Sequence, residues 1–268
     1  MSLVVFYIQT LKMALRSKVW PLVLFCVFCV AVSMFVANAF SPRQPSIVSI
    51  DIGISATRVL GLFVGLTIAQ LMFAADIDRK LINSVLVLPV HRILLLVGRW
   101  LAVVSFVLVF QMISYGCMYL MAKWGLQKYP GLSQPVIQHL PLVFIGSFIE
   151  QLLIVSVMFL FIVISKTPFL AFVLSFIFAI SARSIHAAIN YILFDPDAAS
   201  QLKQSLTSPL LWLKWIIPDL SRLDWRDSVL YGVDYSVSQV LSNITANMSY
   251  AGLILMMAIL LLNRRKFE

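Results

Sequence analysis

The fold is decided by the uncharged stretch Val19-Trp-Pro-Leu-Val-Leu-Phe-Cys-Val-Phe-Cys-Val-Ala-Val-Ser-Met-Phe-Val-Ala-Asn-Ala-Phe40. A helix of about 20 apolar residues crosses a hydrocarbon core about 30 Å thick. The whole chain shares this character, because 61% of its 268 residues are hydrophobic, only 12% are charged, and the mean hydropathy is +0.98. The surface of a soluble domain needs about twice that share of charge. The sequence therefore predicts an integral membrane protein.

Six long apolar runs are found along the chain. They extend from Val19 to Phe40, Ser55 to Ala75, Trp100 to Ala122, His139 to Ile164, Phe169 to Phe194 and Leu241 to Leu262. Their Leu, Ile, Val and Phe residues do not alternate with polar ones, which favours helices over the strands of an outer-membrane barrel. We expect one all-α domain over 1–268, and an even number of spans places both termini on one side of the membrane.

Basic residues indicate which side this is, since they gather in the short cytoplasmic segments of membrane proteins. If the N-terminus is cytoplasmic, the segments on its side hold Lys12, Arg16, Lys18, Arg79, Lys80, Arg92, Arg99, Lys166, Arg264, Arg265 and Lys266. This bias predicts cytoplasmic N and C termini. It also accounts for the net charge of +9, so nucleic acid binding need not be invoked.

The segment from Ser2 to Lys18 has the pattern of an amphipathic helix. Its apolar face would hold Leu3, Tyr7, Leu11, Ala14 and Leu15, with Lys12 and Arg16 one turn apart. Such a helix lies in the membrane interface with its cations at the lipid headgroups. The alternative is a frayed leader with some hydrophobic residues.

The connection between the second and third spans is also amphipathic. Ile77, Leu81, Val85 and Leu88 recur every three to four residues, which predicts a short helix that ends at Pro89. This helix could lie on the membrane or fit a groove on a soluble partner. Periodicity does not choose between the two.

The same connection holds two acidic residues, a basic residue, an apolar run ending in Leu-Pro, a second basic residue and a Gly-Arg pair, which are Asp76, Asp78, Arg79, Leu88, Pro89, Arg92, Gly98 and Arg99. This pattern resembles the loop of type-2 ABC exporter permeases, in which the final pair is Gly-Lys. The chain departs from the family at Lys80 and Leu81, where Gly and Thr are common, and it has Asp in place of the usual Glu.

The resemblance extends over nearly the whole chain. Such permeases have six spans, both termini in the cytoplasm, an amphipathic N-terminal helix, a long outward segment between spans five and six, here 195–239, and a basic tail. The stretch from Trp215 to Gly232 is similar to one that recurs in part of the family, in which an apolar-Pro-Asp turn precedes a short helix ending near Tyr-Gly.

The resemblance implies a permease subunit in the inner membrane of a bacterium, in contact with lipid and paired with a second permease copy, as a homodimer or heterodimer. A separate ATPase subunit would bind ATP and Mg²⁺, since this chain has no phosphate-binding loop and would bind no cofactor itself. Residues at 76–99 would then couple ATP hydrolysis to transport. The coupling residues would be Asp76, Asp78, Arg79, Lys80, Leu88, Pro89 and Arg92.

The outward segment, 195–239, combines tryptophans with charges. Trp212, Trp215 and Trp225 would provide apolar faces, whereas Asp219, Arg222, Asp224, Arg226 and Asp227 would face water. Pro218 would divide the segment into two short re-entrant or interfacial helices on the outer side, where Trp is favoured. These helices form either an outer gate, with Trp215, Pro218, Asp219 and Trp225 as its candidates, or a plain interfacial cap.

Charge is costly inside a membrane span, and the fourth and fifth predicted spans each hold one charged residue. Glu150 and Arg183 are equally distant from the tight turn at 165–168, so the sequence predicts an ion pair between antiparallel neighbours. Its hydrogen-bond neighbours would be Gln111, Gln151, Ser181 and His186. The pair either contacts a substrate or only holds the fourth and fifth spans together.

Two glycines of the second span, Gly61 and Gly65, form a small-xxx-small pair that permits a close helix approach.

Signatures of catalysis and metal binding are absent from the sequence. Cys26 and Cys29 lie within an apolar span without a second pair, which indicates packing, and the three histidines lie at different depths. We therefore expect no catalytic residue, no metal site and no enzyme activity of the chain by itself. Two other classes remain open, a secondary carrier and a membrane scaffold that transports nothing.

Overall fold

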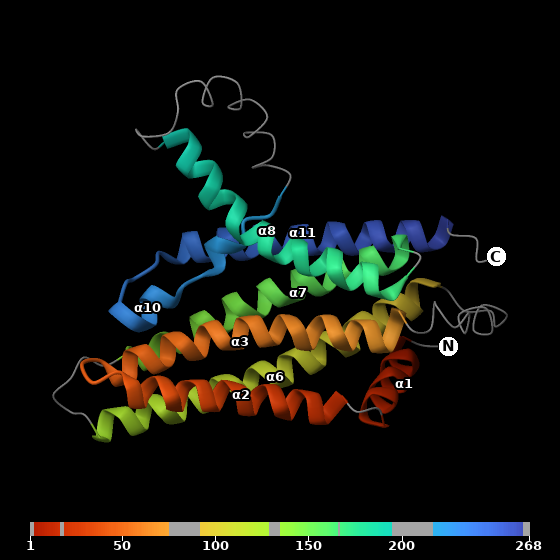
Figure 1. Ribbon diagram of the computed structural model, residues 1–268. Helices are drawn as coiled ribbons and strands as arrows, with labels where there is room; N and C mark the ends of the chain where they lie inside the picture. The colour runs from red at the N-terminus through yellow and green to blue at the C-terminus, as the bar shows by residue number, and fades with distance from the viewer. Residues whose placement is uncertain are drawn as a thin grey trace.

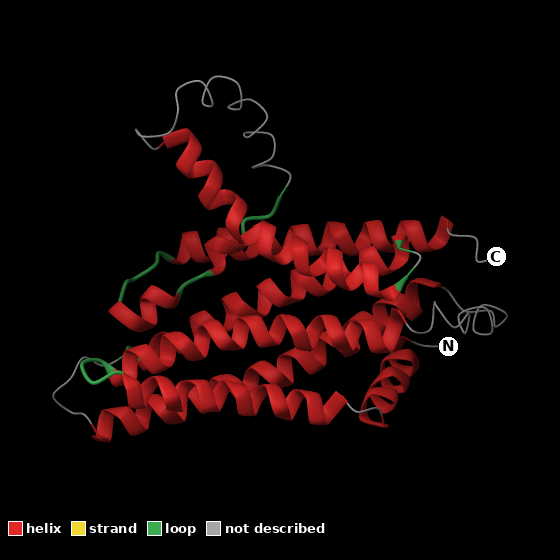
Figure 2. Cartoon of the chain, viewed as in Figure 1, coloured by secondary structure: helices red, strands yellow, loops and turns green. Residues whose placement is uncertain are grey.

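The computed structural model describes residues 3–16, 19–74, 92–128, 135–165, 167–194 and 217–264. These residues form eight α-helices and no strand (Figure 2). Six helices are long and apolar enough to cross a membrane, so the predicted all-helical, multi-pass membrane protein is confirmed. The helices are α1 (Leu3–Arg16), α2 (Val19–Phe40), α3 (Pro45–Ala69), α6 (Arg92–Lys128), α7 (Leu140–Ile164), α8 (Pro168–Phe194), α10 (Arg226–Tyr231) and α11 (Val237–Arg264).

Three short elements extend these helices or join them. The π-helix η1 (Gln70–Ala74) continues α3, and the 3-10 helix η2 (Ile137–His139) leads into α7. A second 3-10 helix, η3 (Leu220–Leu223), precedes α10. The described chain begins and ends at the same end of the bundle, as an even number of spans requires (Figure 1).

Several spans begin earlier than their apolar runs predict. The helix α3 begins at Pro45 and α6 at Arg92, whereas the sequence predicted Ser55 and Trp100. The predicted runs began after Asp51 and Arg99, whereas the helices include both residues. Proline opens α3, α7 and α8 in the first turn, where its missing N–H removes no helical hydrogen bond.

The helix α7 lies at the centre of the bundle. It contacts α3, α6, α8 and α11, and most of its residues are buried. By contrast, α2, α8 and α11 expose large apolar side chains such as Phe28, Phe169 and Met256. Exposed apolar surface of this extent is typical of helices that face lipid. Toward Phe194, α8 turns away from the other helices (Figure 1).

The N-terminal helix α1 crosses the end of the bundle and packs against α6 (Figure 1). It buries a stripe of Phe6, Thr10 and Ala14. This stripe is displaced from the predicted apolar face, because Leu15 of that face is 52% exposed. The Tyr7 hydroxyl shares a 3.1 Å hydrogen bond with the hydroxyl of Ser105. Part of the predicted lipid-facing side is thus used for packing against protein, while the side chains of Lys12 and Arg16 are exposed.

The glycines of α3 permit the predicted close approach. A Cβ at Gly61 would overlap the amide group of Gln151 on α7. A Cβ at Gly65 would lie 3.1 Å from Val155 of α7 and 3.3 Å from Val107 of α6. The three helices therefore meet along these two positions.

Gly61→Val should destabilise the protein by about 1–3 kcal/mol, because the added methyl groups must displace Gln151 from a packed interface. SDS denaturation in mixed micelles, followed by tryptophan fluorescence, measures the loss. Gly252→Val on α11 is the matched control, since a Cβ there meets no atom within 4 Å. Equal effects of both substitutions would contradict close packing at Gly61.

Candidate functional site

Residues 217–231, which we call the inserted segment, enter the bundle between α3, α7 and α8. The segment contains η3 and α10. Leu220, Leu223, Trp225 and Leu230 are all at most 5% exposed, and Trp225 is one of the largest fully buried side chains. Of the two predicted positions of these helices, the interfacial one is wrong for Trp225, because its ring packs inside the protein.

The inserted segment is accommodated by a glycine of α7. A Cβ at Gly146 would overlap the Leu223 carbonyl and lie 3.0 Å from the Trp225 ring. The absence of a side chain at Gly146 thus brings the backbone of the segment against α7.

Local interactions fix the fold of the segment. Asp219 accepts a 3.1 Å hydrogen bond from the Ser221 amide and caps η3. Gly232 ends α10 with a φ of 70°, a left-handed conformation that favours glycine. The short helix therefore ends at Tyr-Gly, as the family resemblance implied. Toward α7, the Val136 amide donates to the Val229 carbonyl at 2.7 Å, and His139 Nδ1 donates to the Ser228 carbonyl at 2.9 Å.

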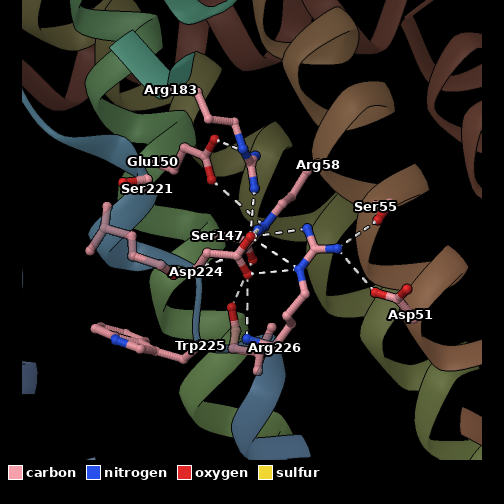
Figure 3. A network of polar contacts seen from close by, with 12 residues as sticks. Asp51, Ser55, Arg58, Ser147, Glu150, Arg183, Ser221, Asp224, Trp225 and Arg226 are labelled. Carbon is pink, nitrogen blue, oxygen red and sulfur yellow. Dashed lines mark hydrogen bonds and ion pairs between the residues drawn. The ribbon is translucent and has the colours of Figure 1, made fainter. Parts of the chain in front are cut away.

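Asp224 is the central residue of a group of charges (Figure 3). Three arginines converge on its Oδ2 atom, with Arg58 Nη1 at 2.5 Å, Arg183 Nη2 at 2.8 Å and Arg226 Nη2 at 3.0 Å. Arg58 Nη2 also donates to the Leu223 carbonyl at 3.4 Å. Residues from α3, α8 and the inserted segment therefore meet at one carboxylate.

Two further carboxylates complete this group. Arg183 Nη1 donates to Glu150 Oε1 at 3.0 Å, and Arg58 Nε lies 3.7 Å from Glu150 Oε2. Arg226 Nη1 lies 3.0 Å from Asp51 Oδ1. We call the six residues the charge network, which consists of Asp51, Arg58, Glu150, Arg183, Asp224 and Arg226.

The charge network is formally neutral, with one guanidinium for each carboxylate. Its buried part lies at Arg58 and Glu150, whose side chains are 4% and 8% exposed, and exposure rises to 41% at Asp51. Burial would raise the pKa of Asp224, but the charges of Arg58 and Arg226 outweigh burial and hold the pKa below its ordinary range. Asp224 is therefore ionised at neutral pH.

The predicted contact between Glu150 and Arg183 is present, and its described partners are Arg58 and Asp224. Gln151 donates instead to the Thr57 carbonyl at 3.4 Å. Gln111 is fully buried on α6. Among the described residues, neither Gln111 nor Ser181 forms a hydrogen bond with Glu150 or Arg183. The side chain of His186 lies outside the described residues.

Sequence reasoning missed the other four members of the charge network. Arg58 could have been found, because it is a lone charge within an apolar stretch of α3 and such a charge needs a partner. Asp224 and Arg226 were predicted to face water, and Asp51 precedes the predicted second span. The prediction that Asp224 and Arg226 face water is corrected by their contacts with Arg58 and Asp51.

The predicted coupling residues lie at the limit of the described chain. Asp76, Asp78, Arg79, Lys80, Leu88 and Pro89 fall outside the described residues, and Arg92 is the first residue of α6, with its side chain outside them.

The helices on either side of the connection between α3 and α6 are linked by a hydrogen bond. Arg99 Nη1 of α6 donates to the Met72 carbonyl of η1 at 2.7 Å, and α1 contacts both elements. The chain therefore leaves and re-enters the bundle beside α1.

The gate candidates are only partly described. Trp215 lies outside the described residues. Pro218 is buried, Asp219 pairs with Arg222 at 3.0 Å, and Trp225 packs on Gly146. Within the described part of the chain, no group of His, Cys, Asp and Glu side chains could hold a metal ion, and Cys26 is a buried free thiol.

No family model and no curated protein matches this chain.

Arg58→Gln should cost about 3–5 kcal/mol of stability, because Asp224 and Glu150 would lose a buried partner. The exposed pair of Arg222 and Asp219 supplies the control, and Arg222→Gln should cost at most about 1 kcal/mol. SDS denaturation of both variants in mixed micelles gives the comparison. A cost for Arg58→Gln as small as that for Arg222→Gln would show that the network does not hold the bundle together.

Gly146→Leu should displace the inserted segment, since the new side chain would occupy the place of the Leu223 carbonyl. A cysteine introduced as Ser228→Cys reports the change, because Ser228 is 1% exposed and should react with maleimide only when the segment moves. The experiment uses a background in which Cys26, Cys29 and Cys117 are replaced by alanine. Gly252→Leu is the control, and slow labelling in both variants would contradict the proposed packing.

Proposed function

We propose that this chain is the membrane-spanning permease subunit of an ATP-driven exporter of the type-2 ABC class, in the inner membrane of a bacterium. The observation that carries the proposal is the pattern from Asp76 to Arg99. The contact between Arg99 and the Met72 carbonyl supports it, because the two ends of the patterned connection are held at one place. Force applied to the connection would pass directly to α3 and α6.

The position of α1 agrees with this proposal. Its exposed Lys12 and Arg16 suit lipid headgroups, while its buried stripe packs on α6 close to the connection. In the proposed exporter, a separate ATPase subunit would bind at this end of the bundle. Closure of two ATPases around ATP would push on the segment at 76–88, and a second permease copy would complete the assembly.

The charge network supplies a means by which such a movement could reach the opposite end of the bundle. Arg58 on α3 and Arg183 on α8 both bind Asp224 of the inserted segment. A shift of α3 relative to α8 must therefore lengthen at least one of these contacts. The inserted segment would act as the outer gate, with Trp225 and Pro218 in the closed position.

One observation favours a second candidate, a secondary carrier. Ionisable side chains within membrane helices often mark ion pathways, and the charge network places Arg58, Glu150 and Arg183 on three helices. The full pairing of these charges fits a structural role equally well. The two candidates differ in their energy source, which is ATP in one and an ion gradient in the other.

The proposal predicts that an ATPase subunit copurifies with the tagged chain from membranes of its host. Asp76→Asn and Pro89→Ala should reduce ATP hydrolysis by the reconstituted complex to the level of the ATPase alone, since the permease would no longer engage it. Asp234→Asn is the matched control, because that side chain is 93% exposed near α10, and it should leave hydrolysis unchanged.

Three outcomes would count against the proposal. No nucleotide-binding chain would copurify, or both coupling variants would retain full ATP hydrolysis, or the control would lose as much as they do. The first would favour a carrier or a scaffold, and the second would remove the role of the connection at 76–99.

A further inference from the structure

A pocket of about 150 Å³ lies where α2 ends, α3 begins and α6 ends. This is the end of the bundle opposite to the chain termini (Figure 1). Phe35 of α2 lines the pocket, together with Ser41 in the turn that follows this helix. Trp124 and Lys128 of α6 form another side. The pocket therefore joins two spans at the level where their apolar runs end.

The pocket presents a positive charge and two neutral hydrogen-bond donors. Lys128 Nζ lies 4.5 Å from the centre of the Trp124 ring, a contact that holds the ammonium group at the pocket. Among the described residues, the Trp124 indole N–H and the Ser41 hydroxyl donate to no acceptor. A cation beside two such donors suits a group with several anionic oxygens, such as a phosphate.

The surroundings of the pocket are positively charged. No acidic side chain is among the described residues that line it. Within 19–74 and 92–128, Asp51 is the only acidic residue, and it pairs with Arg226 at 3.0 Å. Arg43 is exposed in the turn between α2 and α3, and it forms no ion pair within the described part of the chain. Arg43 and Lys128 therefore make this corner complementary to an anion.

An exposed apolar face continues from the pocket along both helices. Phe35 is 61% exposed, and Phe28, two turns earlier on α2, is 64% exposed. Leu120 lies one turn before Trp124 on α6 and is 67% exposed. Both helices are apolar enough to cross a membrane, and they pack against each other. Acyl chains of a lipid would therefore find an apolar surface directly beside the pocket.

From these contacts we propose that the pocket binds the headgroup of an anionic phospholipid. The phosphate would accept hydrogen bonds from Lys128, Trp124 and Ser41, and the acyl chains would lie along Phe35 and Leu120. The volume is below the usual range of about 300–1,000 Å³ for drug-sized ligands, so the pocket holds the headgroup while the chains stay in the bilayer. Free phosphate offers the same oxygens, but the apolar face beside the pocket favours the lipid.

Photolabelling of the full-length protein in nanodiscs tests the site. The probes are phosphatidylglycerol and phosphatidylcholine, each carrying the same diazirine in one acyl chain. Peptide mapping by mass spectrometry should find adducts at Phe35 or Leu120. Phosphatidylglycerol should label these residues about fivefold more than phosphatidylcholine at equal membrane concentration, the contribution of one lysine to the binding of an anionic lipid.

Two lysines of α6 provide a matched pair of variants. Each lies over an aromatic ring four residues earlier, Lys128 over Trp124 and Lys123 over Tyr119 at 4.8 Å, but of the two only Lys128 lines the pocket. Lys128→Gln should lower labelling by phosphatidylglycerol to that of phosphatidylcholine, whereas Lys123→Gln should leave it unchanged. Lys128→Arg keeps the charge and should retain the preference. Both lysines are exposed, so these substitutions should not disturb the fold.

Three results would overturn the proposal. Equal labelling by the two probes in the unaltered protein would show that the pocket does not recognise an anionic headgroup. Equal losses in Lys128→Gln and Lys123→Gln would show that the general charge of this end attracts the lipid. Displacement of phosphatidylglycerol by excess inorganic phosphate would show an anion site that needs no lipid. None of these results depends on an ATPase, so this proposal and the proposed exporter function can fail separately.

Discussion

The contact of Arg58 with Asp224 joins the inserted segment to the membrane-spanning helices, and the arrangement of the other charges depends on it. Arg58 is almost completely buried, and an unpaired guanidinium there would be very costly. Asp224 supplies the compensating carboxylate and also reaches Arg183 and Arg226. Glu150 and Asp51 then balance the remaining positive charge. Removal of the segment would therefore leave the buried Arg58 and the partly buried Arg183 with Glu150 as their shared carboxylate.

Packing and charge cooperate in this arrangement. Gly146 allows Trp225 and the Leu223 carbonyl to approach α7, and that approach places Asp224 within reach of α3 and α8. Gly61 allows Gln151 to lie against α3, which brings α7 and α3 together at the same level of the bundle. A cavity of about 220 Å³ lies between α3, α7 and α8 beside the charge network, so the contacts that hold these helices together also fix its walls.

Sequence reasoning succeeded where a rule is local and failed where it is not. The six spans follow from hydropathy, and the contact of Glu150 with Arg183 follows from their equal distance from one tight turn. No such rule connects Arg58 with Asp224, because they are far apart in the chain and the segment between α8 and α11 has no fixed register. The tryptophans of that segment suggested the membrane interface, where Trp is common, but Trp also fills buried sites. The sequence does not distinguish an interfacial from a buried position for Trp225, because the difference depends on packing against α7.

The order of synthesis gives the network a further consequence. The ribosome makes α3 before α7 and α8, and Asp224 emerges only after all three. Until then, Arg58 has no Asp224 to pair with, and an isolated α3 would carry an uncompensated charge in the membrane. The second span should therefore stay near the insertion machinery or an aqueous surface until the later helices arrive. The bundle would therefore be completed only when its C-terminal part is inserted. Truncation before residue 224 would leave the earlier helices without the carboxylate that pairs with Arg58.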